Sequence, residues 1–282
     1  MTFRIMTFNI RGAVPHRDGP NAWERRAPLT LSLIERTTPD LIGFQELMCR
    51  NLETYQKQLR KYQWVLGPPT MEETRLNYNA IFWNPSRLDL LESGGFWLSP
   101  TPEQWSRSWE STYVRAATWA RFRCPKTGEE FCHLNVHLDS ESAQARLQSC
   151  PLILLQLAAF HLDHLPVLLT GDFNCHANVL SAPCDEETAL THASYRFLLD
   201  HGFVDTYLAA GHLDTPAALT YHGFEGVHYE PAWRVDWILT KNGVSSFTVH
   251  ACAILQDAAP PLYPSDHYPV LAELALTSGA VS

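Results

Sequence analysis

The feature of this sequence that most constrains the fold is a series of apolar segments that each end in a polar side chain. The segment VLLTGDFN, residues 167–174, passes from three aliphatic residues to Asp172 and Asn174 within a few positions. Four further segments follow the same design and end at Asn9, Glu46, His137 and Asp236. Short apolar runs are typical of buried strands, and polar groups at strand ends lie where loops form a crevice.

Helical and strand patterns alternate along the chain. Helices are predicted at residues 25–40, 51–62 and 141–160, and residues 194–207 are predicted to be a helix that leads into a short segment. Strands are predicted at residues 3–12, 40–47, 116–124, 129–138, 165–174, 234–242, 246–255 and 263–276, and a hairpin at 79–99 with its turn at Asn84-Pro85-Ser86. Strands interleaved with helices and hairpins favour a mixed, layered α/β domain over a purely parallel sheet.

One domain spanning residues 1–282 is expected, because no internal repeat, low-complexity tract or linker divides the chain. The segment 181–192 is predicted to be a flexible insertion. Apolar residues make up 45% of the chain and charged residues 18%, which excludes long disordered stretches. The net charge of -9 argues against loose binding to long nucleic acid, where positive surface dominates the affinity.

Localisation is expected to be cytoplasmic, because Met1 is followed at once by a strand pattern and no secretory signal is apparent. No apolar run approaches the roughly 18 residues of a membrane span. The seven cysteines form an odd set without a C-x-x-C pair, which favours reduced thiols. A zinc site at Cys175, beside the TGDFN segment, is the alternative.

Each polar strand end also has an ordinary structural interpretation. Asn9 could be a turn residue, His137 a buried core histidine, and Asp236 a salt-bridge partner of Arg234. Asp266 and His267 could form a plain turn. A structural role alone explains Glu46 less well, since burial of a bare carboxylate costs roughly several kcal/mol unless it is paired or metal-bound. The joint occurrence of these residues favours a functional site.

The segments TFNIRG, GFQE, NVHLD, TGDFN, WRVDWIL and YPSDHYPV resemble, in this order, the signature of the endonuclease/exonuclease/phosphatase superfamily. The resemblance runs from residue 5 to about 275, and FWLSPTPEQ, ATWARF and TYHGF resemble a bacterial branch of stand-alone members. It implies a four-layer α/β sandwich, in which two mixed β-sheets pack face to face and are flanked by helices. The chain departs from that branch after HLD, where a His or Arg is often found.

The resemblance also implies a chemistry, the metal-assisted attack of water on a phosphate ester. Glu46 would be the principal ligand of Mg²⁺ or Mn²⁺, and Asn9 and Asp266 would complete or support the metal site. Asp172 would orient or deprotonate the attacking water, and Asn174 would hold the water or a phosphate oxygen. His267 would donate a hydrogen bond to a non-bridging oxygen, Asp236 would hold the other ring nitrogen of His267, and His137 would contact the phosphate.

Two further residues, Arg115 and Trp97, are candidates for contacts with the substrate. Arg115 is a candidate phosphate clamp, because a guanidinium group offers a planar bidentate fork; a surface salt bridge is the alternative. Trp97 is a candidate stacking surface at the rim, and simple packing of its loop is the alternative.

The favoured function is a phosphoesterase acting on a phosphorylated small molecule or a short nucleic acid. The alternatives are a nuclease acting on DNA or RNA, and a non-catalytic phosphate-binding protein. No membrane and no obligatory protein partner are expected.

Overall fold

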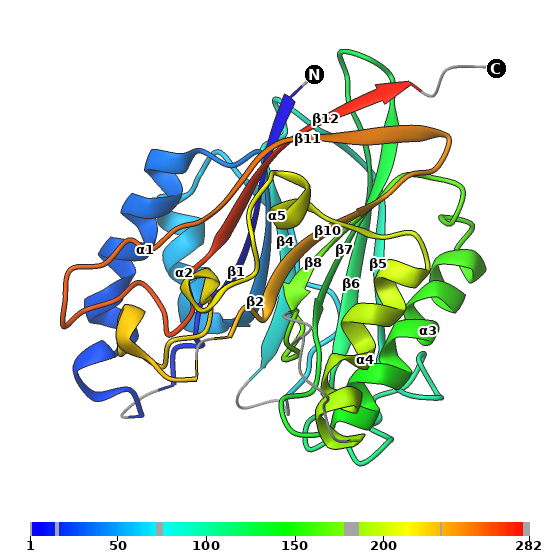
Figure 1. The fold of residues 1–282 in the computed structure, drawn as a ribbon. Helices are drawn as coiled ribbons and strands as arrows, with labels where there is room; N and C mark the ends of the chain where they lie inside the picture. Colours follow the sequence, from blue (N-terminus) through cyan, green and yellow to red (C-terminus); the bar gives the residue numbers. More distant parts are fainter. Residues whose placement is uncertain (1, 15–16, 72–75, 178–185, 232, 279–282) are drawn as a thin grey trace.

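Two six-stranded β-sheets pack face to face, and helices cover the outer face of each sheet (Figure 1). This arrangement was obtained as a computed structural model, which describes residues 2–14, 17–71, 76–177, 186–231 and 233–278. The four layers, helix, sheet, sheet and helix, confirm the predicted sandwich. No helix among the described residues is long and apolar enough to cross a membrane.

The first sheet has the strand order β11-β12-β1-β2-β4-β3. Along the chain its strands are β1 (Thr2–Asn9), β2 (Leu41–Met48), β3 (Gln63–Val65), β4 (Asn77–Trp83), β11 (Ser245–Ile254) and β12 (Val270–Ser278). The central strands β1 and β2 are parallel, whereas the other neighbouring pairs are antiparallel. The sheet is therefore mixed, as predicted.

The second sheet has the strand order β5-β6-β7-β8-β10-β9. Its strands are β5 (Asp89–Trp97), β6 (Ala116–Arg123), β7 (Glu130–His137), β8 (Val167–Asp172), β9 (Val204–Asp205) and β10 (Asp236–Lys241). Here β7 and β8 form the parallel pair. Each sheet thus places one parallel pair in its interior, where both faces are covered.

Helices α1 (Trp23–Thr37) and α2 (Cys49–Gln58) cover the first sheet, and α3 (Ala143–Ala159) and α4 (Glu186–Asp200) cover the second (Figure 1). The short helix α5 (Thr206–Ala209) lies beside β10 and β11. Single 3-10 turns occur at Gly19–Asn21, Pro216–Ala218 and Gly226–His228. Local chemistry fixes the helix ends: Ser142 caps α3 by accepting from the Ala145 N–H, and the left-handed Thr38 ends α1 just before Pro39.

Three apolar clusters fill the spaces between the four layers. The inter-sheet cluster includes Phe3, Ile5, Phe122, Phe131 and Ile238. The cluster under α1 and α2 includes Phe8, Ile34, Phe44 and Tyr55. The cluster under α3 and α4 includes Leu134, Ile153, Leu198 and Trp237. Burial at roughly 25 cal/mol per Å² of apolar surface makes these clusters the main source of stability.

The polar strand ends lie at one end of both sheets. Asn9, His137 and Asp172 are the last residues of β1, β7 and β8, and Asp236 is the first residue of the antiparallel β10. Register places His137, Asp172 and Asp236 side by side across the second sheet. The sheet topology therefore brings together side chains that are more than 200 residues apart in the sequence.

Two sequence predictions about elements were wrong. The expected hairpin at 79–99 does not form: β4 lies in the first sheet and β5 in the second, and the chain crosses between the sheets after Trp83. The helix and short segment predicted at 194–207 correspond to the second half of α4, which spans Glu186–Asp200, and to β9, although α4 begins earlier than expected. The predicted insertion at 181–192 consequently overlaps α4 from residue 186 onward, while residues 181–185 lie outside the described residues.

Candidate active site

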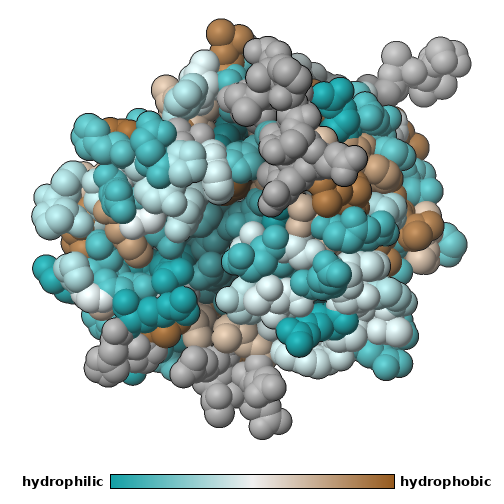
Figure 2. Space-filling view, turned by 60° about the horizontal axis from the view of Figure 1, so that its bottom comes forward, coloured by the Kyte–Doolittle hydropathy of each residue, from teal (hydrophilic) through white to brown (hydrophobic). Residues whose placement is uncertain are grey.

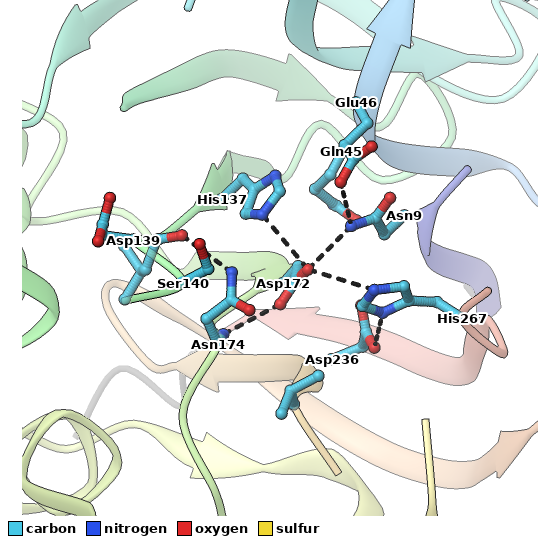
Figure 3. Close-up of polar contacts among 12 residues, drawn as sticks. Asn9, Gln45, Glu46, His137, Asp139, Ser140, Asp172, Asn174, Asp236 and His267 are labelled. Atoms are coloured by element: carbon cyan, nitrogen blue, oxygen red, sulfur yellow. Dashed lines mark hydrogen bonds and ion pairs between the residues drawn. The ribbon is translucent and has the colours of Figure 1, made fainter. Parts of the chain in front are cut away.

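The end of the molecule that carries the polar strand ends faces the reader in Figure 2, where hydrophilic surface lines a hollow near the middle. Figure 3 shows the side chains that gather there from both sheets. Asn9 and Glu46 come from the first sheet; His137, Asp172 and Asp236 come from the second. All of the predicted catalytic and metal-binding residues except Asn174 and Glu46 are buried, and these two are half-buried.

Asp172 is the centre of this arrangement. Its Oδ2 atom accepts a hydrogen bond from Asn9 Nδ2 at 2.9 Å. The same oxygen lies 3.4 Å from His137 Nε2 and 3.7 Å from His267 Nε2. Asn9 Nδ2 also donates to Glu46 Oε1 at 3.3 Å, so one amide nitrogen joins carboxylates from the two sheets (Figure 3).

Glu46 reaches the site because β2 bulges there. The pairing of β2 with β4 shifts register between Phe44 and Leu47, and Glu46 has a φ of 59°. Its Oε2 atom accepts from the Gly12 N–H at 3.1 Å. Arg11 and Asn174, on two other site loops, also have left-handed backbones. Such conformations cost on the order of 1–3 kcal/mol each for residues other than glycine, and they gather at functional sites.

His267 and Asp236 form a buried hydrogen-bonded pair. The ring Nδ1 of His267 lies 2.9 Å from Asp236 Oδ2, and the Ser265 hydroxyl accepts from the His267 N–H. A carboxylate on Nδ1 leaves Nε2 directed toward Asp172 (Figure 3). Burial acts to lower the pKa of His267, but Asp236 and Asp172 outweigh it and raise the pKa to about 10. The ring is therefore a cation that can donate from Nε2.

The pKa of Asp172 is raised, whereas the pKa of a carboxyl group in a salt bridge is usually lowered. Burial raises its pKa to about 7, and Asp236 adds to the shift, while His267 and Asn9 oppose it. A carboxyl group with a pKa near neutrality can accept a proton from water in this range. Its second oxygen, Oδ1, accepts from the Asn174 N–H at 3.0 Å, which fixes the orientation of the carboxyl group.

Glu46 and Asp266 flank the guanidinium group of Arg11. Burial acts to raise the pKa of Glu46, but Arg11, the Gly12 N–H, His267 and Asn9 together lower it. Arg11 Nη1 lies 3.5 Å from Asp266 Oδ2, while Arg11 Nη2 donates to Asp18 Oδ1 at 3.0 Å. Burial and the nearby Glu46 raise the pKa of Asp266, against the opposing effects of His267 and Arg11.

His137 and Asn174 border Asp172. Burial, with the nearby Arg115 and His267 cations, lowers the pKa of His137 well below its ordinary value, so this ring is neutral. Asn174 donates from Nδ2 to the Leu138 carbonyl at 3.0 Å, which anchors its side chain beside the end of β7. Both side chains lie within reach of a group bound to Asp172.

The two predicted substrate contacts differ in their surroundings. Arg115 is largely buried, lies 3.6 Å from Asp139 Oδ2, and interacts electrostatically with Asp172 and Glu46. Burial lowers its pKa, and these carboxylates act against the shift. Trp97 instead donates its indole N–H to the Pro69 carbonyl at 3.0 Å, which holds the ring against a neighbouring loop. Contact of either residue with substrate stays a prediction.

The donor set fits a hard divalent cation. Four carboxyl groups, Glu46, Asp172, Asp236 and Asp266, gather at the site. The cations that act on them include His267, Arg11 and Arg115, but Arg11 is shared with Asp18 and Arg115 with Asp139. Asp236 Oδ1 is buried without a hydrogen-bond partner among the described residues. Excess carboxylate and amide oxygens are the ligands that Mg²⁺ and Mn²⁺ prefer.

A second group of side chains at the site is also close enough to hold a metal ion. Ligand atoms of Asp172, Asp236 and His267 lie within 4.8 Å of one another and could hold a metal ion. However, the His267–Asp236 contact is a hydrogen bond, and an ion there would have to displace its proton. At Glu46 the carboxylate oxygens accept hydrogen bonds from Asn9 Nδ2 and from the Gly12 N–H, neither of which carries a titrating proton. The role of Glu46 as the principal metal ligand stays a prediction. Cys175 is buried and does not belong to the group of Asp172, Asp236 and His267, which is the only such group of three or more histidine, cysteine or carboxylate side chains among the described residues.

Sequence reasoning missed two residues that shape the site. Arg11 neutralises Glu46 and Asp266, and Asp139 accepts hydrogen bonds from Ser111 and the Tyr113 N–H beside Arg115. Arg11 stands in TFNIRG and Asp139 in NVHLD, so the signal was their place inside segments already singled out.

Comparison with known proteins agrees with this fold. A model of the Endonuclease/Exonuclease/phosphatase family matches residues 6–267. The chain belongs to this family, and it is accordingly an enzyme that hydrolyses phosphoric ester bonds.

Two solved structures and one curated protein are similar to the chain. The crystal structure of an endonuclease/exonuclease/phosphatase from Bacteroides vulgatus is 27% identical, with a TM-score of 0.84, and the match covers 98% of this chain and 100% of that one. A mannosyl-6-phosphatase from Bacteroides thetaiotaomicron is 26% identical, with a TM-score of 0.81 and coverage of 97% and 99%. An uncharacterized protein of Acanthamoeba polyphaga mimivirus is 27% identical over 63% of this chain and 69% of its own length.

Proposed function

We propose that the protein is a Mg²⁺- or Mn²⁺-dependent phosphoesterase that acts on a small or short phosphorylated substrate. The observation that carries the proposal is the meeting of Glu46, Asn9, Asp172 and His267 through consecutive contacts at one end of the two sheets. Acidic groups, a cationic histidine and a carboxyl group with a pKa near neutrality are the parts that hydrolysis of an anionic ester needs.

The metal ion would be held by Glu46, with Asn9 and Asp266 in support. When bound, it would neutralise the phosphate and stabilise the charge that develops in the transition state. The positions of Arg11 and Gly12 favour this assignment, because both keep Glu46 in its ionised, ligand-competent form.

The protein's own residues supply proton transfer and orientation. Asp172 takes a proton from the attacking water while the water oxygen bonds to phosphorus and the bond to the leaving oxygen breaks. His267 donates from Nε2 to a non-bridging oxygen, and Asp236 keeps the ring in the required orientation. Asn9 holds the Asp172 carboxyl group in place. His137, Asn174 and Arg115 would contact the other phosphate oxygens.

A small substrate is favoured over long nucleic acid. One of the similar solved structures is a mannosyl-6-phosphatase, and it matches this chain over nearly its full length. The net charge of -9 would oppose a long polyanion. Sugar phosphates are therefore the first substrates to test, followed by nucleotides and short oligonucleotide ends.

A substrate panel tests the proposal. Sugar phosphates, nucleoside monophosphates, bis-p-nitrophenyl phosphate, single-stranded DNA and RNA are incubated with the protein and Mg²⁺ or Mn²⁺, with and without EDTA. We expect EDTA-sensitive release of phosphate from at least one small ester, at a higher kcat/KM than for either polymer. Higher kcat/KM on DNA or RNA would favour the nuclease alternative. No turnover of any ester, with phosphate binding retained, would favour the non-catalytic alternative.

A further inference from the structure

A layer of polar side chains lies in the inter-sheet core directly behind the site. Thr7, Asn135 and Thr170 precede Asn9, His137 and Asp172 by two positions on β1, β7 and β8, so each faces the same side of its strand as the site residue. All three are fully buried. Because an unpaired buried polar group is costly, such a layer persists only where its hydrogen bonds are satisfied.

Asn135 uses the full hydrogen-bonding capacity of its amide. Its Nδ2 atom donates to the Phe44 carbonyl at 2.8 Å and to the Ala80 carbonyl at 3.0 Å. Its Oδ1 atom accepts from Gln45 Nε2 at 2.7 Å and from Thr170 Oγ1 at 3.0 Å. A residue of the second sheet is thereby bonded to β2 and β4 of the first sheet.

These contacts fall where β2 leaves its regular pairing. Phe44 and Ala80 are the last register partners before the bulge, and pairing resumes at Leu47 and Tyr78. Between them two residues of β2, Gln45 and Glu46, face one residue of β4. Glu46 takes its left-handed conformation there. Asn135 therefore bonds both strands, and the Gln45 side chain, at the point where the bulge directs Glu46 into the site.

The space opposite Asn135 admits no larger side chain than that of glycine. A Cβ atom at Gly43 would lie 2.6 Å from Asn135 Oδ1 and 2.3 Å from Thr170 Oγ1. The two sheets thus approach closely at this layer, and the amide of Asn135 has one position in which all four of its bonds are made.

We propose that Asn135 is a positioning residue that holds the β2 bulge and so sets the affinity of Glu46 for the divalent cation. The inference rests on the proposed function, since Glu46 is there the principal metal ligand. Removal of the amide takes the side-chain donor from the Phe44 and Ala80 carbonyls and leaves Gln45 Nε2 with only Thr7 Oγ1 and the Gly43 carbonyl, so the bulge that directs Glu46 is held less firmly. Partners that orient a metal ligand typically affect metal affinity by about 10–100-fold.

The test is Mn²⁺ binding, measured by isothermal titration calorimetry on the wild type, Asn135→Ala and His133→Ala, well below each melting temperature. His133 is the matched control: it is buried on the same strand and face, two residues farther from the site, and contacts Thr170 rather than β2. Both variants should lower the Tm. Only Asn135→Ala should raise the Kd for Mn²⁺, by about 10–100-fold.

Equal Mn²⁺ affinity in wild type and Asn135→Ala would overturn the inference, as would equal weakening in both variants. Absence of Mn²⁺ binding to the wild type would instead overturn the proposed function and this inference with it. If Asn135→Ala does not fold, Asn135→Ser provides the same test with a smaller loss of packing. Excess Mn²⁺ should restore the kcat of a folded Asn135 variant, and failure to do so would also count against a role through metal affinity.

Discussion

At the scale of single residues, Asp172 is where contacts from both sheets meet. Asn9 reaches it from the first sheet, and His137 reaches it from the neighbouring strand of the second. His267 approaches from the loop before β12. Because three side chains converge on Oδ2, this oxygen is the atom whose chemistry the site is built to control.

Replacement of Asp172 by Asn should lower kcat by about 10²–10⁴-fold, because the amide cannot accept a proton from water. The measurement is steady-state hydrolysis of the best ester of the substrate panel, with circular dichroism to verify folding. Asp89→Asn is the matched control, since Asp89 is an exposed residue on β5 of the same sheet. A folded Asp172→Asn variant with wild-type turnover would remove Asp172 from the mechanism.

The pH profile of kcat/KM should be bell-shaped. Asp172 must be ionised, and its pKa of about 7 makes activity rise through this pH; a bound cation would move that limb lower. His267 must be protonated, and its pKa of about 10 makes activity fall as the pH rises through this value. His267→Gln should remove the alkaline limb. A wild-type profile without an alkaline limb up to pH ~11 would contradict the role of His267.

Sequence alone indicated most of the site residues but not how they contact one another. Asn9, Glu46, Asp172 and Asp236 stood out because polar groups at the ends of apolar segments need a reason to be there. Arg11 did not, although it stands inside TFNIRG, because its role depends on a contact with Asp266 that joins residues 255 positions apart. Long-range contacts of this kind depend on sheet order, which periodicity does not encode.

At the scale of elements, a buried ion network supports the start of β10. Arg234 Nη2 donates to Asp205 Oδ2 at 2.6 Å and to Asp214 Oδ2 at 3.1 Å, and its guanidinium group lies over the Tyr207 ring. Arg234 precedes Asp236 by two residues, so this network fixes the strand that carries the partner of His267.

Substitution of Arg234 by Ala should lower the free energy of unfolding by about 3–5 kcal/mol, because it leaves Asp205 and Asp214 as buried charges without their cation. Urea denaturation followed by fluorescence measures this change. Arg50→Ala is the control, since the Arg50–Glu24 pair is exposed and its loss should cost about 0–1 kcal/mol. Similar losses in both variants would show that the buried network is not a special source of stability.

Element types were easier to predict than element pairing. The apolar runs at 165–174 and 129–138 became β8 and β7. The segment at 79–99 was wrongly predicted to be a hairpin, because two strands joined by Asn-Pro-Ser have the local signature of one. The structure separates them, because Trp83 packs with the first sheet and β5 pairs with β6. Local turn chemistry cannot distinguish a hairpin from a crossing between packed sheets.

At the scale of the whole molecule, the site exists only when the two sheets are packed together. Glu46 and Asn9 belong to one sheet, and Asp172 and Asp236 to the other. A cation bound between them would bind the folded chain and not the unfolded one, so it would stabilise the fold.

Mg²⁺ at about 100 times its Kd should therefore raise the free energy of unfolding by about 2.7 kcal/mol and raise the Tm. Differential scanning calorimetry with Mg²⁺, and with Na⁺ at the same ionic strength, measures the shift. Glu46→Gln should lose most of it, whereas Glu273→Gln, at an exposed position on β12, should retain it. An equal shift in both variants would place the bound cation elsewhere.

The most direct test of the central claim is an anomalous-difference map from crystals of the protein grown with Mn²⁺ and measured near the manganese absorption edge. The account predicts a peak in direct contact with the Glu46 carboxylate, beside Asn9 and Asp266. A peak between Asp236 and His267 with none at Glu46, or no peak at the ends of the two sheets, would contradict it.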